Sequence, residues 1–284
     1  MQRLGKNRLS AFQKIFFMTI LICMFAASGG YAAEGTLLMA TTTSTDNTGL
    51  LDYLMPSFTA ATGININWTS TGTGKALKLG ENCDVDVLLV HAPQAEKNFV
   101  NQGFGVDRRE IMYNDFVLIG PPEDPAGIMG KSAGEALRAV RSAASVFVSR
   151  GDNSGTNKKE LALWKIADVP TPEQETWYRQ SGQGMLATIN VAAELSGYTL
   201  TDRGTYIKYE SVADGKPSLV ILVEGDNVLL NQYSVIPVDP KHCANVKYDK
   251  AKILSGWLAG AEAQRMIGDF KLLGKQLFTP NANR

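Results

Sequence analysis

Apolar residues along this chain switch between the spacing of strands and the spacing of helices. Short apolar or alternating runs predict strands at 37–40, 64–68, 85–90, 116–119, 146–148, 219–223 and 234–238. Apolar residues three and four positions apart predict helices at 50–61, 132–141, 157–167 and 248–270, the last with a break near 256–260. Strands separated by helices are typical of βαβ units, so we expect an α/β protein with mostly parallel sheets flanked by helices.

The length of the chain and one turn-rich stretch predict two lobes. The chain has 284 residues, which is long for one domain and sufficient for two. Residues 120–125 are rich in proline and glycine and interrupt the pattern of strands and helices. We expect residues 34–113 and 235–284 to form lobe I and residues 114–234 to form lobe II. The chain would then cross between the lobes twice, and the two crossings would form a hinge.

The N-terminal segment 1–33 has the pattern of a secretory signal peptide. Basic side chains at positions 3, 6, 8 and 14 come first, an apolar run over 15–25 follows, and small residues lead to Ala32 and Ala33. The apolar run is too short to span a bilayer, which favours a cleaved signal over the alternative, a membrane anchor. We therefore expect cleavage near Ala32 or Ala33 and export of a soluble mature chain to an oxidising compartment.

Charge and cysteine content restrict the possible partners. Lysine plus arginine and aspartate plus glutamate both number 28, so no global field draws the chain to nucleic acid or to anionic lipid. Removal of the signal segment leaves Cys83 and Cys243, which an oxidising compartment would allow to pair; two separate buried thiols are the alternative. The chain has two histidines, too few to favour a transition-metal cation site, and we expect no resident cofactor.

Three loops rich in hydroxyl side chains and glycine, at 41–44, 70–74 and 149–156, each join a predicted strand to a predicted helix. Such a turn presents backbone N–H groups to an anion, and the carboxyl end of a strand is where open parallel sheets bind ligands. In the third loop Arg150 adds a permanent charge, and Gly155 permits close approach. Ser154 and Thr156 add hydroxyl donors. The three loops therefore predict one anion site between the lobes.

The first two loops also have a purely structural interpretation. Asp46, Asn47 or Thr48 could simply cap the next helix, although four consecutive hydroxyls exceed what one cap needs. The second loop resembles a phosphate-binding Walker loop but lacks its first glycine, because Thr69 stands there. It also has Ala76 where that motif requires serine or threonine after the lysine. The alternative for this loop is a plain turn.

Residues near the third loop have alternatives too. Arg150 could form a surface salt bridge instead of binding an anion, and Asp152 is expected to cap the following helix. The segment 198–206, which contains Arg203, could line the rim of the cleft or be a solvated connection. Tyr233 could reach the site from the hinge or pack beneath it. The sequence contains no Gly-x-Ser-x-Gly or His-Glu-x-x-His motif, which disfavours an enzyme.

These loops and their neighbouring segments resemble the periplasmic tungstate-binding proteins of ABC uptake systems, over essentially the whole mature chain. The segments that carry the resemblance are 40–44, 70–74, 83–93, 113–121, 149–156 and 201–206. The resemblance implies a two-lobed class II solute-binding fold, with tungstate bound in the cleft between the lobes and passed to an ABC permease. It also implies ligand contacts from Thr41, Thr42, Thr43, Ser44, Thr71, Gly72, Thr73, Arg150 and Thr156.

Tungstate at neutral pH is an unprotonated tetrahedral dianion, so it only accepts hydrogen bonds and a selective site should present donors alone. We therefore expect Asp46, Asp152 and Asp202 to point away from the ligand, since a carboxylate in contact would favour phosphate, which keeps a proton. Carriers for molybdate, phosphate or sulfate are alternatives, as are an exported phosphoryl-transfer enzyme and a ligand sensor. In the carrier interpretation the mature chain is a monomer and does no chemistry.

Overall fold

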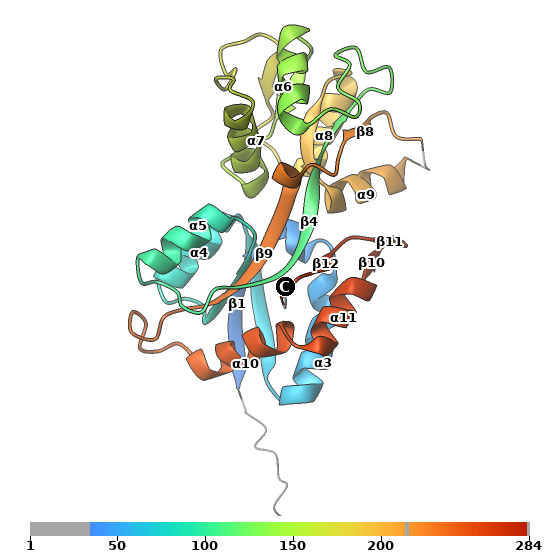
Figure 1. The fold of residues 1–284 in the computed structure, drawn as a ribbon. Helices are drawn as coiled ribbons and strands as arrows, with labels where there is room; N and C mark the ends of the chain where they lie inside the picture. The colour runs from blue at the N-terminus through green and yellow to red at the C-terminus, as the bar shows by residue number, and fades with distance from the viewer. Residues whose placement is uncertain (1–34, 214–215, 283–284) are drawn as a thin grey trace, which may run out of the picture.

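Two neighbouring strands, β4 (Arg109–Gly120) and β9 (Leu230–Pro237), run between the two lobes of the molecule (Figure 1). The structure is a computed structural model that describes residues 35–213 and 216–282. The two strands pair antiparallel, with Asn114 opposite Asn231, so the chain leaves one lobe along β4 and returns along β9. The signal peptide predicted at 1–33 lies outside the described residues.

Lobe I, the lower lobe in Figure 1, contains a sheet in the order β12-β4-β9-β3-β1-β2. Strand β1 pairs parallel with β2 and β3, whereas β9 runs antiparallel to both β3 and β4. The remaining strands of the lobe are β1 (Thr36–Thr42), β2 (Asn65–Thr71), β3 (Val87–Val90), β10 (Lys271–Leu272), β11 (Lys275–Gln276) and β12 (Thr279–Pro280). The helices are α2 (Thr43–Asp46), α3 (Leu50–Thr62), α4 (Thr73–Glu81), α5 (Pro93–Asn101), α10 (Tyr248–Leu258) and α11 (Ala261–Asp269).

Both faces of this sheet are covered, because successive side chains of a strand point to opposite faces. Leu37 and Met39 of β1 belong to the apolar cluster under α3, α10 and α11. Ala40, together with Leu88 and Val90 of β3, belongs to a second cluster under α4 and α5. The helices cover the two faces of the sheet, so the loops that follow β1 and β2 lie uncovered at the end of the lobe that faces lobe II (Figure 1).

Lobe II contains the last part of β4, with which β7 (Thr199–Asp202) and β8 (Val220–Val223) both pair antiparallel. The short strands β5 (Phe147–Ser149) and β6 (Tyr178–Gln180) form a separate parallel pair. The helical segments are α6 (Ala133–Ser142), α7 (Gly155–Ile166), α8 (Met185–Glu194), α9 (Arg203–Val212) and the 3₁₀ turn η1 (Asn227–Leu229). Two buried apolar clusters, one on each side of β4, hold these elements together.

The two-lobed α/β fold is confirmed, but its sheets are mixed instead of mostly parallel. Within the described residues, parallel pairing joins β1 to β2 and β3, β5 to β6, and Phe147 to Tyr198 in a single bridge. The hinge is the physical reason, since a chain that leaves on one strand and returns on its neighbour makes that pair antiparallel. The expected lobe limits, after residues 113 and 234, fall inside β4 and β9, and they stay a prediction.

The predicted helices are present with shifted ends. The segment 248–270 is two helices, α10 and α11, separated at Ala259 and Gly260. Helix α7 begins at Gly155, two residues before the predicted start, because the Ser154 hydroxyl caps it. No helix in the part of the chain that the structure describes is long and apolar enough to cross a membrane.

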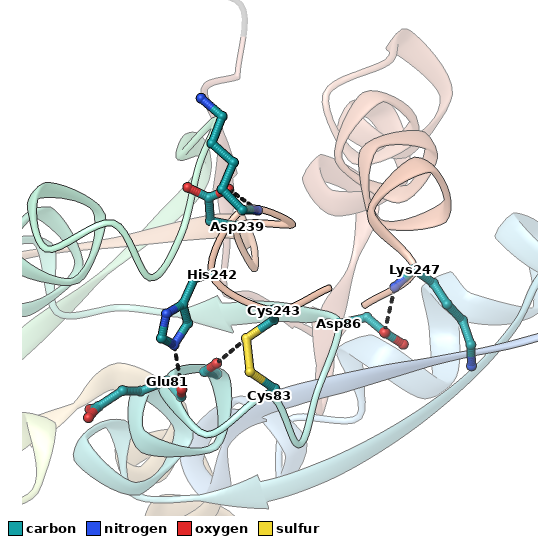
Figure 2. The surroundings of a disulfide bond; sticks show 9 residues. Glu81, Cys83, Asp86, Asp239, His242, Cys243 and Lys247 are labelled. Atoms are coloured by element: carbon teal, nitrogen blue, oxygen red, sulfur yellow. Dashed lines mark hydrogen bonds between the residues drawn. A yellow bond between two sulfur atoms is a disulfide. The ribbon is translucent and has the colours of Figure 1, made fainter. Parts of the chain in front are cut away.

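A disulfide joins Cys83, in the turn after α4, to Cys243, in the loop after β9 (Figure 2). The two Cα atoms are 5.5 Å apart although the residues are 160 positions apart along the chain. Asp86 accepts a hydrogen bond of 2.8 Å from the Lys247 amide in the same region. Of the two alternatives that the sequence leaves open, pairing is therefore the correct one, and it fastens the returning chain to lobe I.

Removal of this disulfide should lower stability. Cys83→Ala combined with Cys243→Ala frees a long loop in the unfolded chain, so we expect the free energy of unfolding to fall by about 2–5 kcal/mol. Urea unfolding of the mature chain with and without a reducing agent measures the effect. The reducing agent should shift the parent midpoint to that of the double variant and leave the variant unchanged. A parent chain insensitive to the reducing agent would contradict the bond.

Candidate functional site

The three hydroxyl-rich loops meet around one cavity of about 500 Å³ between the lobes. Ten of the eleven expected ligand residues line it: Thr42, Thr43, Ser44, Thr71, Gly72, Thr73, Arg150, Ser154, Gly155 and Thr156. The other lining residues are Gly74, Lys75, His91, Asp152, Asn153 and Lys158. Loops separated by about a hundred positions in sequence thus share one cavity, and its wall combines hydroxyls, helix starts and basic side chains.

The first loop begins as β1 ends, and it differs from the expectation at Thr41. That side chain is fully buried and donates a hydrogen bond of 2.9 Å to the Leu89 carbonyl oxygen of β3, so its hydroxyl serves the sheet. Thr42 starts the short helix α2 and accepts from the Thr45 amide at 3.3 Å. Thr42, the first residue of this loop that lines the cavity, is therefore also the N-cap of α2.

The capping alternative for the first loop holds only in part. Helix α3 begins after Gly49, whose φ of 78° suits glycine, and the Leu50 amide donates to the Thr48 hydroxyl at 3.1 Å. Asp46 instead accepts a hydrogen bond of 2.7 Å from Trp68 Nε1. Asp46 is thus hydrogen-bonded to β2 and does not line the cavity, as expected for a donor-only site.

The second loop places a buried hydroxyl in the cavity wall. Thr73, the first residue of α4, is 2% exposed, and its Oγ1 has no hydrogen-bond partner among the described residues. A Cβ atom added at Gly155 would lie 3.5 Å from this oxygen and 3.4 Å from His91 Cε1. Lobe II therefore approaches lobe I closely here, and glycine at position 155 keeps the approach open.

The third loop is held from beneath by a buried carboxylate. Glu160 of α7 accepts hydrogen bonds from Trp164 Nε1 at 2.9 Å, from Tyr178 Oη at 2.7 Å and from the Ser149 hydroxyl. Burial raises the pKa of Glu160 against the effect of these donors. Ser149 Oγ in turn accepts from the Gly151 amide at 3.2 Å, so the loop has a defined path where it faces the cavity.

Arg150 points its guanidinium into this loop and is only partly satisfied there. Its Nη2 lies 2.5 Å from Asp152 Oδ2, while its Nε is buried and unpartnered within residues 35–213 and 216–282. Asp152 Oδ1 accepts from the Ser154 amide at 3.1 Å. Partial burial of Asp152 opposes ionisation, but the Ser154 hydrogen bonds and the Arg150 charge hold its pKa below the ordinary value.

Two expectations about aspartate therefore change. Asp152 does not cap α7, because Ser154 accepts the Asn157 amide at 3.3 Å and takes that position. Asp152 also lines the cavity instead of standing clear of it, although both carboxylate oxygens are occupied by donors of its own loop. Asp202 caps α9, accepting from the Thr205 amide at 2.9 Å, and is absent from the cavity wall.

Neither Arg203 nor Tyr233 lines the cavity. The Arg203 guanidinium binds both oxygens of Asp115 on β4, at 2.6 and 2.5 Å, and Glu224 at 2.7 Å. Tyr233 is 1% exposed and stacks on His91 with ring centroids 4.7 Å apart. Of the alternatives open from the sequence, Tyr233 packs beneath the site, and Arg203 lies in an ion-pair network that joins α9 to β4.

His91 is one of the cavity-lining residues that sequence reasoning missed. It follows β3 at the carboxyl end of that strand, and its Nε2 lies 3.0 Å from Thr42 Oγ1 and 3.2 Å from Ser44 Oγ. Burial lowers its pKa, against the Asn231 hydrogen bond and the Asp202 charge. Its place directly after a fully apolar strand, beside the strand that leads to the first loop, is the signal that could have identified it.

This chain is similar to a known family of domains and to known proteins. Residues 27–262 match the model of the PBP superfamily domain. The chain is 51% identical over 240 residues to the tungstate-binding protein TupA of Campylobacter jejuni, covering 84% of this chain and 88% of that protein.

Two solved structures are also similar. The tungstate-binding protein TupA from Desulfovibrio alaskensis G20 has 64% identity and a TM-score of 0.84, covering 88% of this chain and 100% of that one. The tungstate ABC transporter structure from Geobacter sulfurreducens has 47% identity and a TM-score of 0.74, covering 84% and 100%. The relatives are named for binding and transport and not for an enzymatic reaction. This chain therefore belongs to the PBP superfamily and, within it, to the family of the tungstate-binding proteins.

Proposed function

We propose that this chain captures tungstate in the cleft between its lobes and delivers it to the membrane permease of an ABC transporter. One observation carries the proposal: the cleft holds buried donors on both walls that lack acceptors. Thr73 Oγ1 lies on the side of lobe I and Arg150 Nε on the side of lobe II, and neither has a partner in the described chain. An oxyanion between them supplies acceptors to both walls at once.

The kind of donor favours an anion without a proton. Hydroxyls, helix N-terminal amides and a guanidinium all donate to the four oxygens of a tetrahedral dianion. Asp152 is the single carboxylate among the described residues that line the cavity, and its two oxygens already accept from Ser154 and Arg150. A protonated oxyanion such as hydrogen phosphate needs an acceptor, and this wall offers a poor one.

Charge in the cleft is positive although the whole chain is balanced. Arg150, Lys75 and Lys158 line the cavity against the single carboxylate of Asp152, whereas basic and acidic residues both number 28 overall. Basic side chains in a cleft with low-dielectric walls attract small anions over a distance. The attraction is therefore local to the cleft.

Delivery depends on closure about the hinge. Residues 34–113 and 235–284 would move as one lobe and residues 114–234 as the other, with β4 and β9 as the connection. Both lobes donate to the same anion, so the ligand stabilises the closed form, which the permease then recognises. This is a binding role without chemistry. The signal-peptide pattern of the N-terminal segment and the family support a periplasmic location, where we propose that the mature protein is a soluble monomer.

The function is tested by competitive calorimetry on the mature chain with tungstate, molybdate, sulfate and phosphate. Tungstate should bind and should displace sulfate and phosphate, which should bind weakly. Tighter binding of phosphate or sulfate than of tungstate would replace this proposal by another oxyanion carrier. Turnover of a chromogenic phosphate ester would support the phosphoryl-transfer alternative instead.

Loss of the Arg150 side chain should weaken binding far more than loss of Arg203. Arg150→Ala removes a charged, forked donor from the cavity wall, and we expect tungstate affinity to fall about 100-fold. Arg203→Ala removes an arginine that pairs with Asp115 outside that wall, so affinity should change by less than about threefold. Calorimetry on both variants, with circular dichroism as a check of folding, gives the ranking. Equal losses would refute it.

Two threonine-to-valine changes separate a ligand hydroxyl from a structural one. Thr73→Val keeps the side-chain shape and removes the unpartnered donor, so tungstate should bind about tenfold more weakly. Thr41→Val removes the hydroxyl that donates to Leu89, so the free energy of unfolding should fall by about 1 kcal/mol with affinity unchanged. Calorimetry and urea unfolding measure both variants. An affinity loss at Thr41 equal to that at Thr73 would contradict the assignment.

A further inference from the structure

His91 occupies a position between the anion loop and the hinge. His91 is 7% exposed, and its ring lies flat against Tyr233 of β9. Nδ1 lies 2.9 Å from Asn231 Oδ1, also on β9, and Nε2 faces the hydroxyls of Thr42 and Ser44. Every polar atom of the ring therefore has a partner, and each partner belongs either to the cavity wall or to a strand of the hinge.

The partners of Asn231 assign the proton on the ring. Asn231 Nδ2 donates to Asn114 Oδ1 at 2.7 Å and to Tyr233 Oη at 3.2 Å, which directs its Oδ1 toward His91. In this orientation of the Asn231 amide its oxygen faces Nδ1, and since an amide oxygen only accepts, Nδ1 of His91 carries the hydrogen. In the neutral ring, Nε2 then has a lone pair and no hydrogen.

A neutral His91 accepts a hydrogen bond from a hydroxyl that could otherwise donate to an anion in the cavity. Thr42 Oγ1 and Ser44 Oγ lie 3.0 and 3.2 Å from Nε2, and each oxygen has a single hydrogen. If one of these hydrogens points to Nε2, it does not point to an anion. With a proton on Nε2 the direction reverses: the ring donates to a hydroxyl oxygen, and the hydroxyl hydrogen that no longer points to Nε2 can face the cavity. For Thr42 this requires that the Thr45 hydroxyl, 2.7 Å away, is the donor of that pair.

We propose that His91 is a positioning residue that takes up a proton when the anion binds, so that its imidazolium turns the Thr42 and Ser44 hydroxyls toward the ligand. This inference rests on the proposed function. The ring would touch the hydroxyls and not the anion. It would contribute both a direction for their hydrogens and a positive charge behind them.

The charged groups around the ring agree with a change on binding. Without an anion, burial lowers the pKa of His91, and the carboxylate of Asp202, from the end of β7, acts in the opposite direction. Arg150, Lys75 and Lys158 line the same cavity with the carboxylate of Asp152, and by Coulomb's law the cations oppose a charged ring and the carboxylate favours one. Tyr233, Asn231 and Asn114 present neutral groups. A dianion in the cavity adds two negative charges, which raise the pKa of His91 and favour the imidazolium.

The sign of the pH dependence follows from linkage. Anion binding raises the pKa of His91 above its value in the free protein, so affinity is greatest below the free-state pKa. As pH rises from the free-state pKa of His91 to its anion-bound pKa, affinity for the anion falls by up to about tenfold per pH unit. Above the anion-bound pKa the contribution of the proton is lost. Proton uptake reaches about one per anion in that interval.

The experiment is calorimetry with sodium tungstate from about pH 6 to about pH 8, in buffers of different ionisation enthalpy. The parent chain should take up to about one proton per anion and bind more tightly at the lower pH. His91→Gln keeps a neutral donor and acceptor, so it should take up no proton and lose the pH dependence. His242→Gln, which changes the other histidine outside the cavity, is the matched control and should behave as the parent.

A measurement without substitution guards against a folding defect. The chain has two histidines, so ring-nitrogen NMR of the parent resolves both, and the His242→Gln spectrum assigns them. Saturating tungstate should move the Nε2 signal of His91 to its protonated position. Tungstate binding without proton uptake, or with uptake that persists in His91→Gln, overturns this inference alone. Absence of tungstate binding by the parent at every pH overturns the proposed function and this inference together.

Discussion

Ligand binding and closure of the lobes both depend on buried hydrogen-bond donors that have no acceptor in the described chain. Leaving such a group unpaired costs about 1–3 kcal/mol, so a ligand that supplies an acceptor gains that free energy. Of the six buried, unpartnered side-chain atoms in the described chain, Thr73 Oγ1 and Arg150 Nε are the two whose residues line the cavity, on opposite walls. An acceptor shared by both walls removes two penalties at once, which ties ligand binding to the approach of the lobes.

The donors can act in this way because the protein holds them in place before the ligand arrives. Glu160 fastens the third loop from below through Ser149, while Asp152 holds the Arg150 guanidinium at 2.5 Å. The first loop is fixed by its own cap at Thr42. A preorganised wall loses little conformational entropy when the anion enters, so more of the hydrogen-bond energy remains as affinity.

Most of the architecture and the location of the site could be predicted from the sequence, because both depend on local patterns. Hydroxyl-rich turns between a strand and a helix are readable in one dimension, and ten of the eleven chosen residues line the cavity. Thr41 is the exception, since only the position of β3 shows that its hydroxyl donates to Leu89. The strand directions of the hinge also depend on how the lobes connect, which spacing alone does not reveal.

Other features needed distances between remote residues. Cys83 and Cys243 are 160 positions apart, and no local pattern states that their Cα atoms approach to 5.5 Å. His91 has no motif of its own, and its role arises from Asn231 on a strand that returns much later in the chain. Asp152 looked like a helix cap because it precedes α7, but Ser154 is closer to the helix start and takes that role.

The pairing of Arg150 with Asp152 has a consequence for which anions the cleft accepts. Asp152 Oδ1 receives the Ser154 amide and Oδ2 receives the guanidinium, so an anion that carries a proton must compete with one of them for an acceptor. An unprotonated dianion faces no such competition, because it needs donors and finds them in the hydroxyls, the helix starts and Arg150 Nε. The carboxylate can therefore stand in the cavity wall without repelling the preferred ligand, since the arginine that it holds carries the opposite charge. Asp152 is the only carboxylate among the described residues of the cavity wall. Selection between protonated and unprotonated oxyanions then depends on the strength of its ion pair with Arg150.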